Sequence, residues 1–254
     1  MRTSLFILAL SGLLGACSQA RDVGDGNGPG TVASIKQNAQ FADDTMINLV
    51  DPGHDTNVLL TSGSLPVVVD VFYLSGKTTD TGSDPGTVTL AQTISLGANE
   101  TARHKVNTKD PAFAGGYGAI FLNTESGGPS DLFQTYAQYS GCMFSTGGTV
   151  FMGSSYRVPY WDKSTKMVLV VTNQADFTFD VQISNVGTLE QKTVTLPPLS
   201  TYRFDSADEG FTLNGTNSIQ ILTSDGGLIA LSGFVDRVGG RIRITPVKAA
   251  PYAI

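Results

Sequence analysis

Residues 177–183 read Phe-Thr-Phe-Asp-Val-Gln-Ile, a stretch in which apolar and polar side chains alternate without exception. A period of two places Phe177, Phe179, Val181 and Ile183 on one face of a strand and the polar residues on the other. In an antiparallel sheet, such an apolar face packs on a core while the opposite face meets water. The stretch therefore predicts a half-buried β-strand.

The rest of the chain carries further β signals and almost no helical periodicity. Two apolar runs, Pro66–Leu74 and Lys166–Thr172, are rich in β-branched and aromatic residues, and residues 241–245 alternate again. These runs are short, and Gly, Pro, Asn or Asp separate them in a chain that has 29 Gly and 11 Pro. Short strands spaced in this way are typical of antiparallel sandwiches and barrels. We therefore expect an all-β protein.

The chain also repeats itself at a constant spacing. Residues 93–103 (TISLGANETAR) align with residues 193–203 (TVTLPPLSTYR), and residues 122–127 align with residues 222–227 at the same offset of 100. Thr, Leu, Thr and Arg coincide in the longer block. A fixed offset across two separate blocks indicates an internal duplication.

The duplication predicts two tandem domains of about 100 residues, the usual size of an immunoglobulin-like antiparallel β-sandwich. We assign the first domain to residues 41–140 and the second to residues 161–254. Residues 141–160, which are rich in Gly and aromatic side chains, then form a linker between the domains.

One segment of the first copy has no counterpart in the second. Asp70-Val71 aligns with Asp180-Val181 only if a segment is inserted in the first copy. The polar segment Lys77–Gly86 fits this insertion, because exposed hairpin tips tolerate added residues. We expect this segment to be such a tip.

The amino terminus has the features of a targeting segment. Residues 1–16 carry Arg2, an apolar run that begins at Leu5, and small residues at the end, as in a cleavable signal peptide. Residues 14–17 (Leu-Gly-Ala-Cys) resemble the lipobox of bacterial lipoproteins at every position. The resemblance implies cleavage before Cys17, a diacylglyceryl group on its thiol and acylation of the new amino terminus.

The residues after the cleavage site predict where the anchor lies and how the body is attached. Ser18 stands where inner-membrane lipoproteins of enteric bacteria have Asp, so the resemblance implies the outer membrane without indicating the leaflet. Residues 17–40 contain a Gly-rich stretch, so we expect the lipidated Cys17 to be followed by a flexible tether. The mature chain resembles tandem β-sandwich modules of bacterial surface proteins, without matching one named family.

Composition and charge exclude several classes of function. The net charge of −6 and the pI near 4.8 leave no basic surface for DNA or RNA. Two Cys and two His are too few for a disulfide scaffold and make a metal centre improbable, and no cofactor motif is present. His54 lies in a Pro-Gly turn, and His104 lies between Arg103 and Lys105 on a face that we expect to be solvated. We therefore expect no catalytic residue, no cofactor and no metal.

Carboxylates and aromatic residues are the remaining candidates for a site. An acid pair could serve a glycosidase; the acids considered are Glu100, Glu125, Asp131, Asp162, Asp205, Asp208, Glu209 and Asp236. An aromatic cluster near the boundary of the two copies includes Tyr156, Tyr160 and Trp161. These side chains could pack between the domains, or they could contact a sugar or a protein partner.

Together these features predict a non-catalytic lipoprotein of the bacterial outer membrane with a structural, adhesion or assembly role. Its expected partners are the membrane, through the lipid on Cys17, and an envelope protein or a glycan. A carbohydrate-binding surface lipoprotein is the first alternative, and a glycoside hydrolase-like enzyme is the second.

Overall fold

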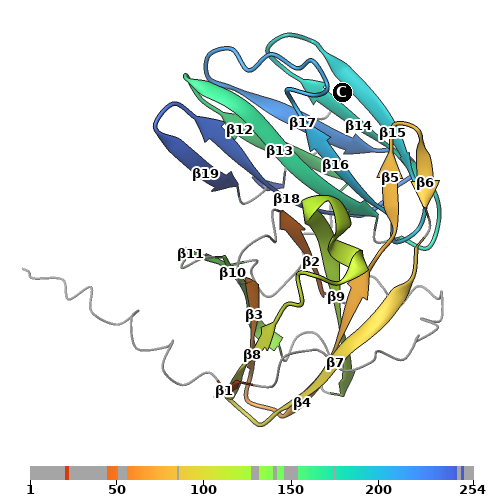
Figure 1. Cartoon of the computed structure of the whole chain (residues 1–254), viewed down its shortest axis with the longest axis vertical. Coiled ribbons are helices and arrows are strands. Elements are labelled where there is room, and N and C mark those ends of the chain that lie inside the picture. The colour runs from red at the N-terminus through yellow and green to blue at the C-terminus, as the bar shows by residue number, and fades with distance from the viewer. Residues whose placement is uncertain are drawn as a thin grey trace, which may run out of the picture.

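The computed structural model describes residues 21–22, 45–50, 56–84, 86–126, 132–139, 142–145, 154–173, 175–244 and 247–248 (Figure 1). Over these ranges the chain is all-β with mostly antiparallel sheets, as the sequence predicts, and its one helical segment there is the 3₁₀ turn η3 (Pro111–Gly116). In the same ranges, no helix has the length and apolar character needed to cross a membrane.

The first half of the chain folds into two sheets that enclose one core. In sheet A the strand order is β1 (Arg21–Asp22), β8 (Thr101–Lys105), β3 (Thr56–Ser62), β10 (Leu132–Tyr139) and β11 (Cys142–Ser145). In sheet B the order is β2 (Thr45–Val50), β9 (Tyr117–Ser126), β4 (Val67–Leu74) and β7 (Val88–Leu96). Alternate residues of these strands fill the space between the sheets, among them Leu60, Val69, Ile94 and Ile120.

The second half folds into two more sheets around its own core. In sheet C the order is β19 (Gly240–Ile244), β18 (Ile229–Arg237), β13 (Ser164–Asn173), β16 (Thr201–Asp205), β5 (Lys77–Thr79) and β6 (Gly82–Asp84). In sheet D it is β15 (Gln191–Leu196), β14 (Phe179–Asn185), β17 (Asn217–Thr223), β12 (Ser155–Tyr160) and β20 (Val247–Lys248). The alternation predicted for β14 is present, since Phe179, Val181 and Ile183 lie in the core, whereas Phe177 precedes the strand and is 42% exposed.

The two halves have the same strand order. When strands are matched in chain order, β2-β9-β4-β7 of sheet B corresponds to β12-β17-β14-β15 of sheet D. In the same way, β8-β3-β10-β11 of sheet A corresponds to β16-β13-β18-β19 of sheet C. Four strands have no counterpart in the other half. They add to the ends of the shared strand orders, at the edges of the sheets, and they are β1, β5, β6 and β20.

The repeat extends to individual turns and contacts. Asn99 and Leu199, which are 100 residues apart, both adopt the left-handed conformation, with φ of 56° and 54°. The hydroxyl oxygens of Thr61 and Thr101 lie 3.0 Å apart across β3 and β8, and those of Thr172 and Thr201 lie 3.0 Å apart across β13 and β16. The offset of 100 therefore marks equivalent positions in the two halves.

Strand register corrects one part of the alignment. Val69 lies opposite Ile94 in sheet B, and Val181 lies opposite Val194 in sheet D. Because Ile94 and Val194 are equivalent by the offset of 100, Val69 is the counterpart of Val181. The match of Asp70-Val71 to Asp180-Val181 was therefore wrong by two residues, a shift that keeps each side chain on the same face.

The outer faces of sheets B and C pack on each other. Phe72, Ala119 and Phe121 of sheet B form a buried cluster with Ala230 of sheet C. A second cluster joins Val168, Val170 and Phe234 of sheet C to the ring of Tyr117 on β9. Strands β4 and β13 are thus buried on both faces, which explains why their sequences are continuous apolar runs rather than alternating ones.

Two segments differ from their expected roles. The range 141–160, expected as a linker, contains β11 and β12, and β12 pairs with β17 and β20 in sheet D. The segment Lys77–Gly86 is a hairpin, but it is not a free tip. Its strand β5 pairs in parallel with β16, so the first half donates the β5–β6 hairpin to sheet C of the second half (Figure 1). A hairpin that completes a sheet is a poor place for further insertions.

Candidate functional site

The β5–β6 hairpin docks on the second half through its backbone and two hydroxyl groups. The amide of Thr201 donates a hydrogen bond of 3.0 Å to the carbonyl of Gly76, and the hydroxyls of Thr78 and Ser200 form a buried hydrogen bond. Gly86, with φ of 58°, closes the base of the hairpin. A Cβ there would lie 2.3 Å from the amide nitrogen of Gly76, so the close approach of the two arms requires glycine.

Lys77 fixes the base of the hairpin to the first half. Its Nζ donates hydrogen bonds to the carbonyls of Ala112 (2.8 Å) and Tyr117 (2.7 Å) and lies 4.2 Å from the centroid of the Tyr117 ring. Burial lowers the pKa of Lys77 to about 8, so the side chain is still mostly protonated at neutral pH and can donate both bonds.

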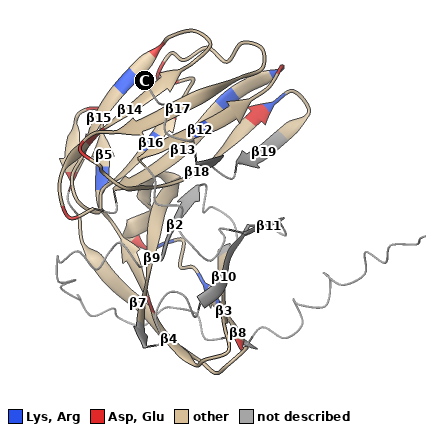
Figure 2. Ribbon diagram, turned by 180° about the vertical axis from the view of Figure 1, so that it is seen from behind, with Lys and Arg blue, Asp and Glu red and all other residues tan. Residues whose placement is uncertain are grey.

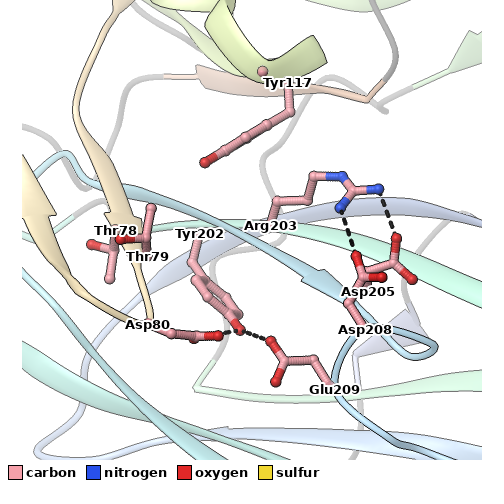
Figure 3. Close-up of a pocket in the computed structure, with 10 residues that line it drawn as sticks. Thr78, Thr79, Asp80, Tyr117, Tyr202, Arg203, Asp205, Asp208 and Glu209 are labelled. Atoms are coloured by element: carbon pink, nitrogen blue, oxygen red, sulfur yellow. Dashed lines mark hydrogen bonds and ion pairs between the residues drawn. The ribbon is translucent and has the colours of Figure 1, made fainter.

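A pocket of about 260 Å³ lies where the hairpin, η3 and β16 meet (Figure 3). Its walls come from both halves of the chain and are mostly polar; they consist of Thr78, Thr79, Asp80, Gly115, Tyr117, Tyr202, Arg203, Asp205, Asp208 and Glu209. Three of these acids, Asp205, Asp208 and Glu209, are among those considered from the sequence. The fold therefore brings predicted acids together with residues that the sequence did not single out.

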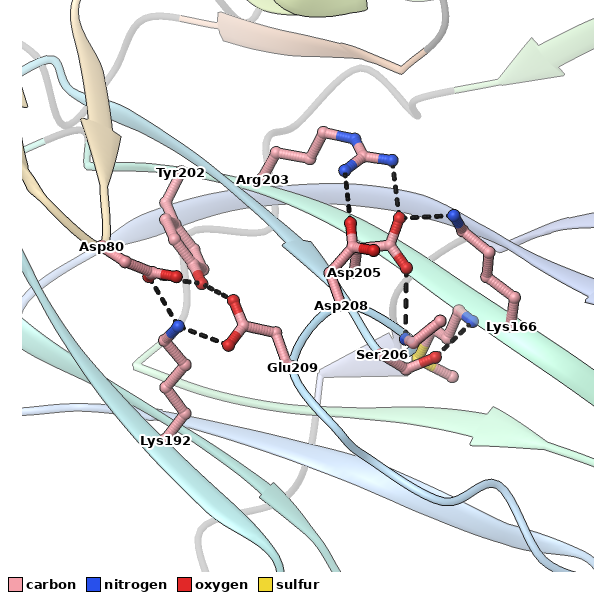
Figure 4. A network of polar contacts seen from close by, with 11 residues as sticks. Asp80, Lys166, Lys192, Tyr202, Arg203, Asp205, Ser206, Asp208 and Glu209 are labelled. Atoms are coloured by element: carbon pink, nitrogen blue, oxygen red, sulfur yellow. Dashed lines mark hydrogen bonds and ion pairs between the residues drawn. The ribbon is translucent and has the colours of Figure 1, made fainter.

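One side of the pocket is a hydrogen-bonded group around Lys192 (Figure 4). Lys192 Nζ lies 2.6 Å from Asp80 Oδ1 and forms a second ion pair with Glu209. The hydroxyl of Tyr202 donates a 2.5 Å hydrogen bond to Glu209 Oε1. Burial lowers the pKa of Lys192, but its hydrogen bonds to the two carboxylates outweigh burial, so the pKa is raised overall. Lys192 therefore holds the hairpin tip, through Asp80, against the second half.

The other side of the pocket is centred on Asp205, whose side chain is only 2% exposed. Asp205 Oδ2 lies 2.6 Å from Lys166 Nζ and accepts a 2.8 Å hydrogen bond from Arg203 Nη2, while Asp208 lies 3.9 Å from Arg203 Nη1. Burial raises the pKa of Asp205, but the hydrogen bonds from Lys166 and Arg203 outweigh it and hold the pKa below its usual range. Asp205 is therefore ionised at neutral pH and has no proton to give as a general acid.

The arrangement favours binding over proton transfer. The buried carboxylates are engaged by Lys166, Arg203 and Lys192, while the carboxylates of Asp80 (59% exposed) and Asp208 (74% exposed) remain open to solvent. Figure 2 shows acidic and basic segments in close succession around β5, β15 and β16. Exposed carboxylates beside aromatic rings and a guanidinium can accept and donate hydrogen bonds to a polyhydroxy ligand.

The aromatic residues expected as partner contacts have two different environments. Tyr156 and Tyr160 are 1% and 0% exposed and belong to the core between sheets C and D. Their hydroxyls bond inside the protein, to the carbonyl of Ile229 (3.0 Å) and to Asn185 Oδ1 (2.8 Å). These two tyrosines are packing residues, because β12 alternates and points them inward. Trp161 follows β12 and keeps part of its side chain exposed.

His104 does not lie on a solvated face, as the sequence analysis expected. It is fully buried, and burial rather than the neighbouring cations lowers its pKa to about 4. Its Nε2 lies 2.8 Å from the hydroxyl of Tyr73, and its Nδ1 lies 2.7 Å from Gln92 Oε1. The Tyr73 hydroxyl also accepts a 3.0 Å bond from the amide of Asn107. Neutral His104, with its proton on Nδ1, satisfies this network.

Some predicted residues lie outside the part of the chain that the structure describes, and some residues near the pocket were not predicted. Cys17 and His54 lie outside the described residues, and so does the rest of the predicted tether apart from β1. Asp80 and Tyr117 of the pocket, and Lys192 beside it, were not predicted as site residues; Asp80 lies in the segment expected to be an exposed hairpin tip. No local sequence signal shows that this segment docks on another sheet.

His104 makes the stability of the fold depend on pH. Its pKa of about 4 in the folded state lies below the ordinary value of about 6.5, so the unfolded chain binds the proton more readily. Stability should fall as the pH drops from about 6.5 toward 4, by roughly 3 kcal/mol in total, and this contribution should be constant above pH 7. Urea unfolding at pH 7.5 and pH 5 measures the change. His104→Gln should lose most of the pH dependence and His54→Gln should keep it; an unchanged dependence in His104→Gln would contradict this assignment.

Among the described residues, no group of three or more His, Cys, Asp or Glu side chains is arranged to hold a metal ion. No protein-family model matches the chain, and neither the curated proteins nor the solved structures compared with it gave a match.

Proposed function

We propose that this chain is a lipoprotein of the bacterial outer membrane, with two tandem immunoglobulin-like β-sandwich domains and a structural, adhesion or assembly role in the cell envelope. The lipobox-like residues 14–17 support the anchor. The equal strand orders and the matching turns at Asn99 and Leu199 support tandem domains that arose by duplication. Because sandwiches serve many functions, the fold alone does not specify the role, which depends on particular residues.

One observation supports the non-catalytic role: the charged groups at the pocket form ion pairs with one another. Lys166 and Arg203 bind Asp205, and Lys192 binds both Asp80 and Glu209. Of these contacts, the ion pair of Lys192 with Asp80 joins the hairpin of the first half to the second half, and the others lie within the second half. Groups engaged in this way stabilise the junction, whereas a glycosidase needs one carboxyl group that remains protonated.

A loop end of the second half offers a surface for a partner protein. There the amide of Val238 donates a 3.0 Å bond to the carbonyl of Lys163, and the amide of Val186 donates a 3.1 Å bond to Ser218. The first bond joins the turns that follow β12 and β18. The second joins the turn that follows β14 to β17, whose Ser218 lies opposite Pro159 of β12. Leu189 is 84% exposed and Val238 is 67% exposed, and Trp161 lies in one of the joined turns. Exposed apolar side chains gathered in this way are typical of contact sites.

The anchor is tested by the mass of the mature chain. The protein purified from membranes should begin at Cys17, and its amino-terminal peptide should carry a diacylglyceryl group and an acyl chain. Cys17→Ser should abolish both the modification and membrane attachment, while Cys142→Ser should leave both unchanged. A soluble mature protein that begins at another residue would overturn the anchor.

The partner surface is tested by cross-linking in intact cells. Leu189→Asp with Val238→Asp should reduce the main cross-linked partner at least tenfold, because two exposed apolar contacts become charged. The left-handed φ of 65° at Leu189 suits Asp better than Leu, so the fold should be retained. Leu65→Asp, at a 54% exposed position in the first half, is the matched control. Equal capture by the double variant and the control would place the contact elsewhere.

A carbohydrate-binding role is the second candidate, and the junction pocket favours it. The pocket combines the partly exposed ring of Tyr117 with Arg203 and the exposed carboxylate of Asp208, whereas the ring of Tyr202 is buried in the core (Figure 3). Aromatic faces and bidentate polar groups are the usual means of holding a sugar.

Glycan-array binding separates the two roles and their sites. If the pocket holds a sugar, Asp208→Ala should weaken binding about tenfold, since it removes an acceptor at a 74% exposed position without disturbing the core. Asp162→Ala, an exposed acid outside the pocket, should bind like the unaltered chain. Loss of binding in Trp161→Ala alone would instead assign the sugar to the loop end, and no binding to any glycan would remove this candidate.

A further inference from the structure

The edge of sheet A next to β8 is occupied by β1, a strand from the segment that precedes the first predicted domain. Strand β1 pairs in parallel with β8, so that Arg21 lies opposite Ala102 and Asp22 lies opposite Arg103. Every other pairing within sheets A and B is antiparallel. Because β1 pairs in parallel, it differs from the other strands of these sheets, and we regard it as an added strand that comes from the predicted membrane tether.

The equivalent edge of the second half is completed in the same way. Strand β16, the counterpart of β8, pairs in parallel with β5, so that Lys77 lies opposite Thr201 and Thr78 lies opposite Tyr202. Tyr202 is 100 residues after Ala102, so both acceptor strands receive their partner at the same position. Two donor segments of unrelated sequence thus fill one edge of a common fold.

The backbone explains why this edge takes a strand. The carbonyl of Glu100 accepts a 2.9 Å bond from Ser62 of β3, so the next residue of β8, Thr101, directs its backbone groups to the other side. In the second half, Thr201 at the equivalent position donates its amide outward to Gly76. An uncovered row of such groups is a site for strand addition, and both halves cover it with another part of the chain.

We propose that the β8 edge is the docking site of the membrane tether, and that it holds the first half close to the bilayer. This proposal rests on the lipid anchor at Cys17. Only three residues separate Cys17 from Arg21, so the lipidated residue lies within about 14 Å of the edge of sheet A. The body is therefore not suspended on the whole of residues 17–40.

Docking also orients the molecule on the membrane. Strand β1 lies at the end of the molecule opposite β14, β15 and β17 in Figure 1. The first half then faces the bilayer, and the second half lies on the far side of the first. The proposed partner surface belongs to the second half, so it is held away from the bilayer, where an envelope protein can reach it.

Two insertions of equal length distinguish a docked tether from a free one. Twenty Gly/Ser residues inserted after Ser18 lengthen the segment between the lipid and β1, whereas the same insertion after Gly26 lengthens the segment between β1 and the body. If β1 is docked, only the first insertion should move the protein layer away from the bilayer, by roughly 15 Å for a flexible chain. Neutron reflectometry of the full lipidated chain on a supported bilayer measures that distance.

The control and the contrary outcomes separate this proposal from the anchor itself. Cys17→Ser should form no layer, which excludes simple adsorption. Equal displacement by both insertions would overturn the docking of β1 while leaving the lipid anchor intact. If the unaltered chain forms no layer, the anchor is wrong, and the docking proposal that rests on it is overturned as well.

Discussion

The packing of sheet B on sheet C is the constraint on which the rest of the molecule depends. Phe72, Phe121 and Phe234 lie on outer faces that would meet water if the halves were separate, and each is at most 5% exposed here. Burial of apolar area contributes about 25 cal/mol per Å², so three buried aromatic side chains favour a joined structure. The opposite outer face, on sheet D, carries Gln191, Thr193 and Thr195 on β15, all exposed.

The polar junction follows from that packing. Once the two sheets meet, the β5–β6 hairpin lies beside β16, and its backbone groups are best satisfied by joining sheet C. Ion pairs with exposed partners, such as Asp80 with Lys192, add little stability by themselves. Buried Asp205 is different, because an unpaired charge there would be costly, so Lys166 and Arg203 must stay in place. Packing thus sets the relative position of the halves, and the ion pairs select one geometry of the hairpin and loops.

The sequence predicted the features that local patterns encode. All-β structure followed from short alternating strands, and the offset of 100 identified equivalent turns because a left-handed residue and a cross-strand Thr pair recur at that spacing. The buried position of His104 was also predictable, since the alternation that turns Arg103 and Lys105 outward turns the residue between them inward. The pocket was not predictable, because Asp80 reaches Lys192 only after a segment of one half docks on the other. No periodicity within the hairpin specifies its acceptor.

Strand addition at one edge makes the two halves unequal despite their common fold. The second half takes its added strand, β5, from the first half, so its sheet C is complete only when both are present. The first half takes its added strand, β1, from the segment that we propose carries the lipid. Each unit is thus completed by the part of the chain that precedes it. This order gives the molecule a direction, which runs from the predicted amino-terminal tether through the first half to the second half. A symmetric pair of sandwiches would lack such a direction. If the molecule is attached at one end, as we propose, every copy presents the same surface outward, as the proposed adhesion or assembly role requires.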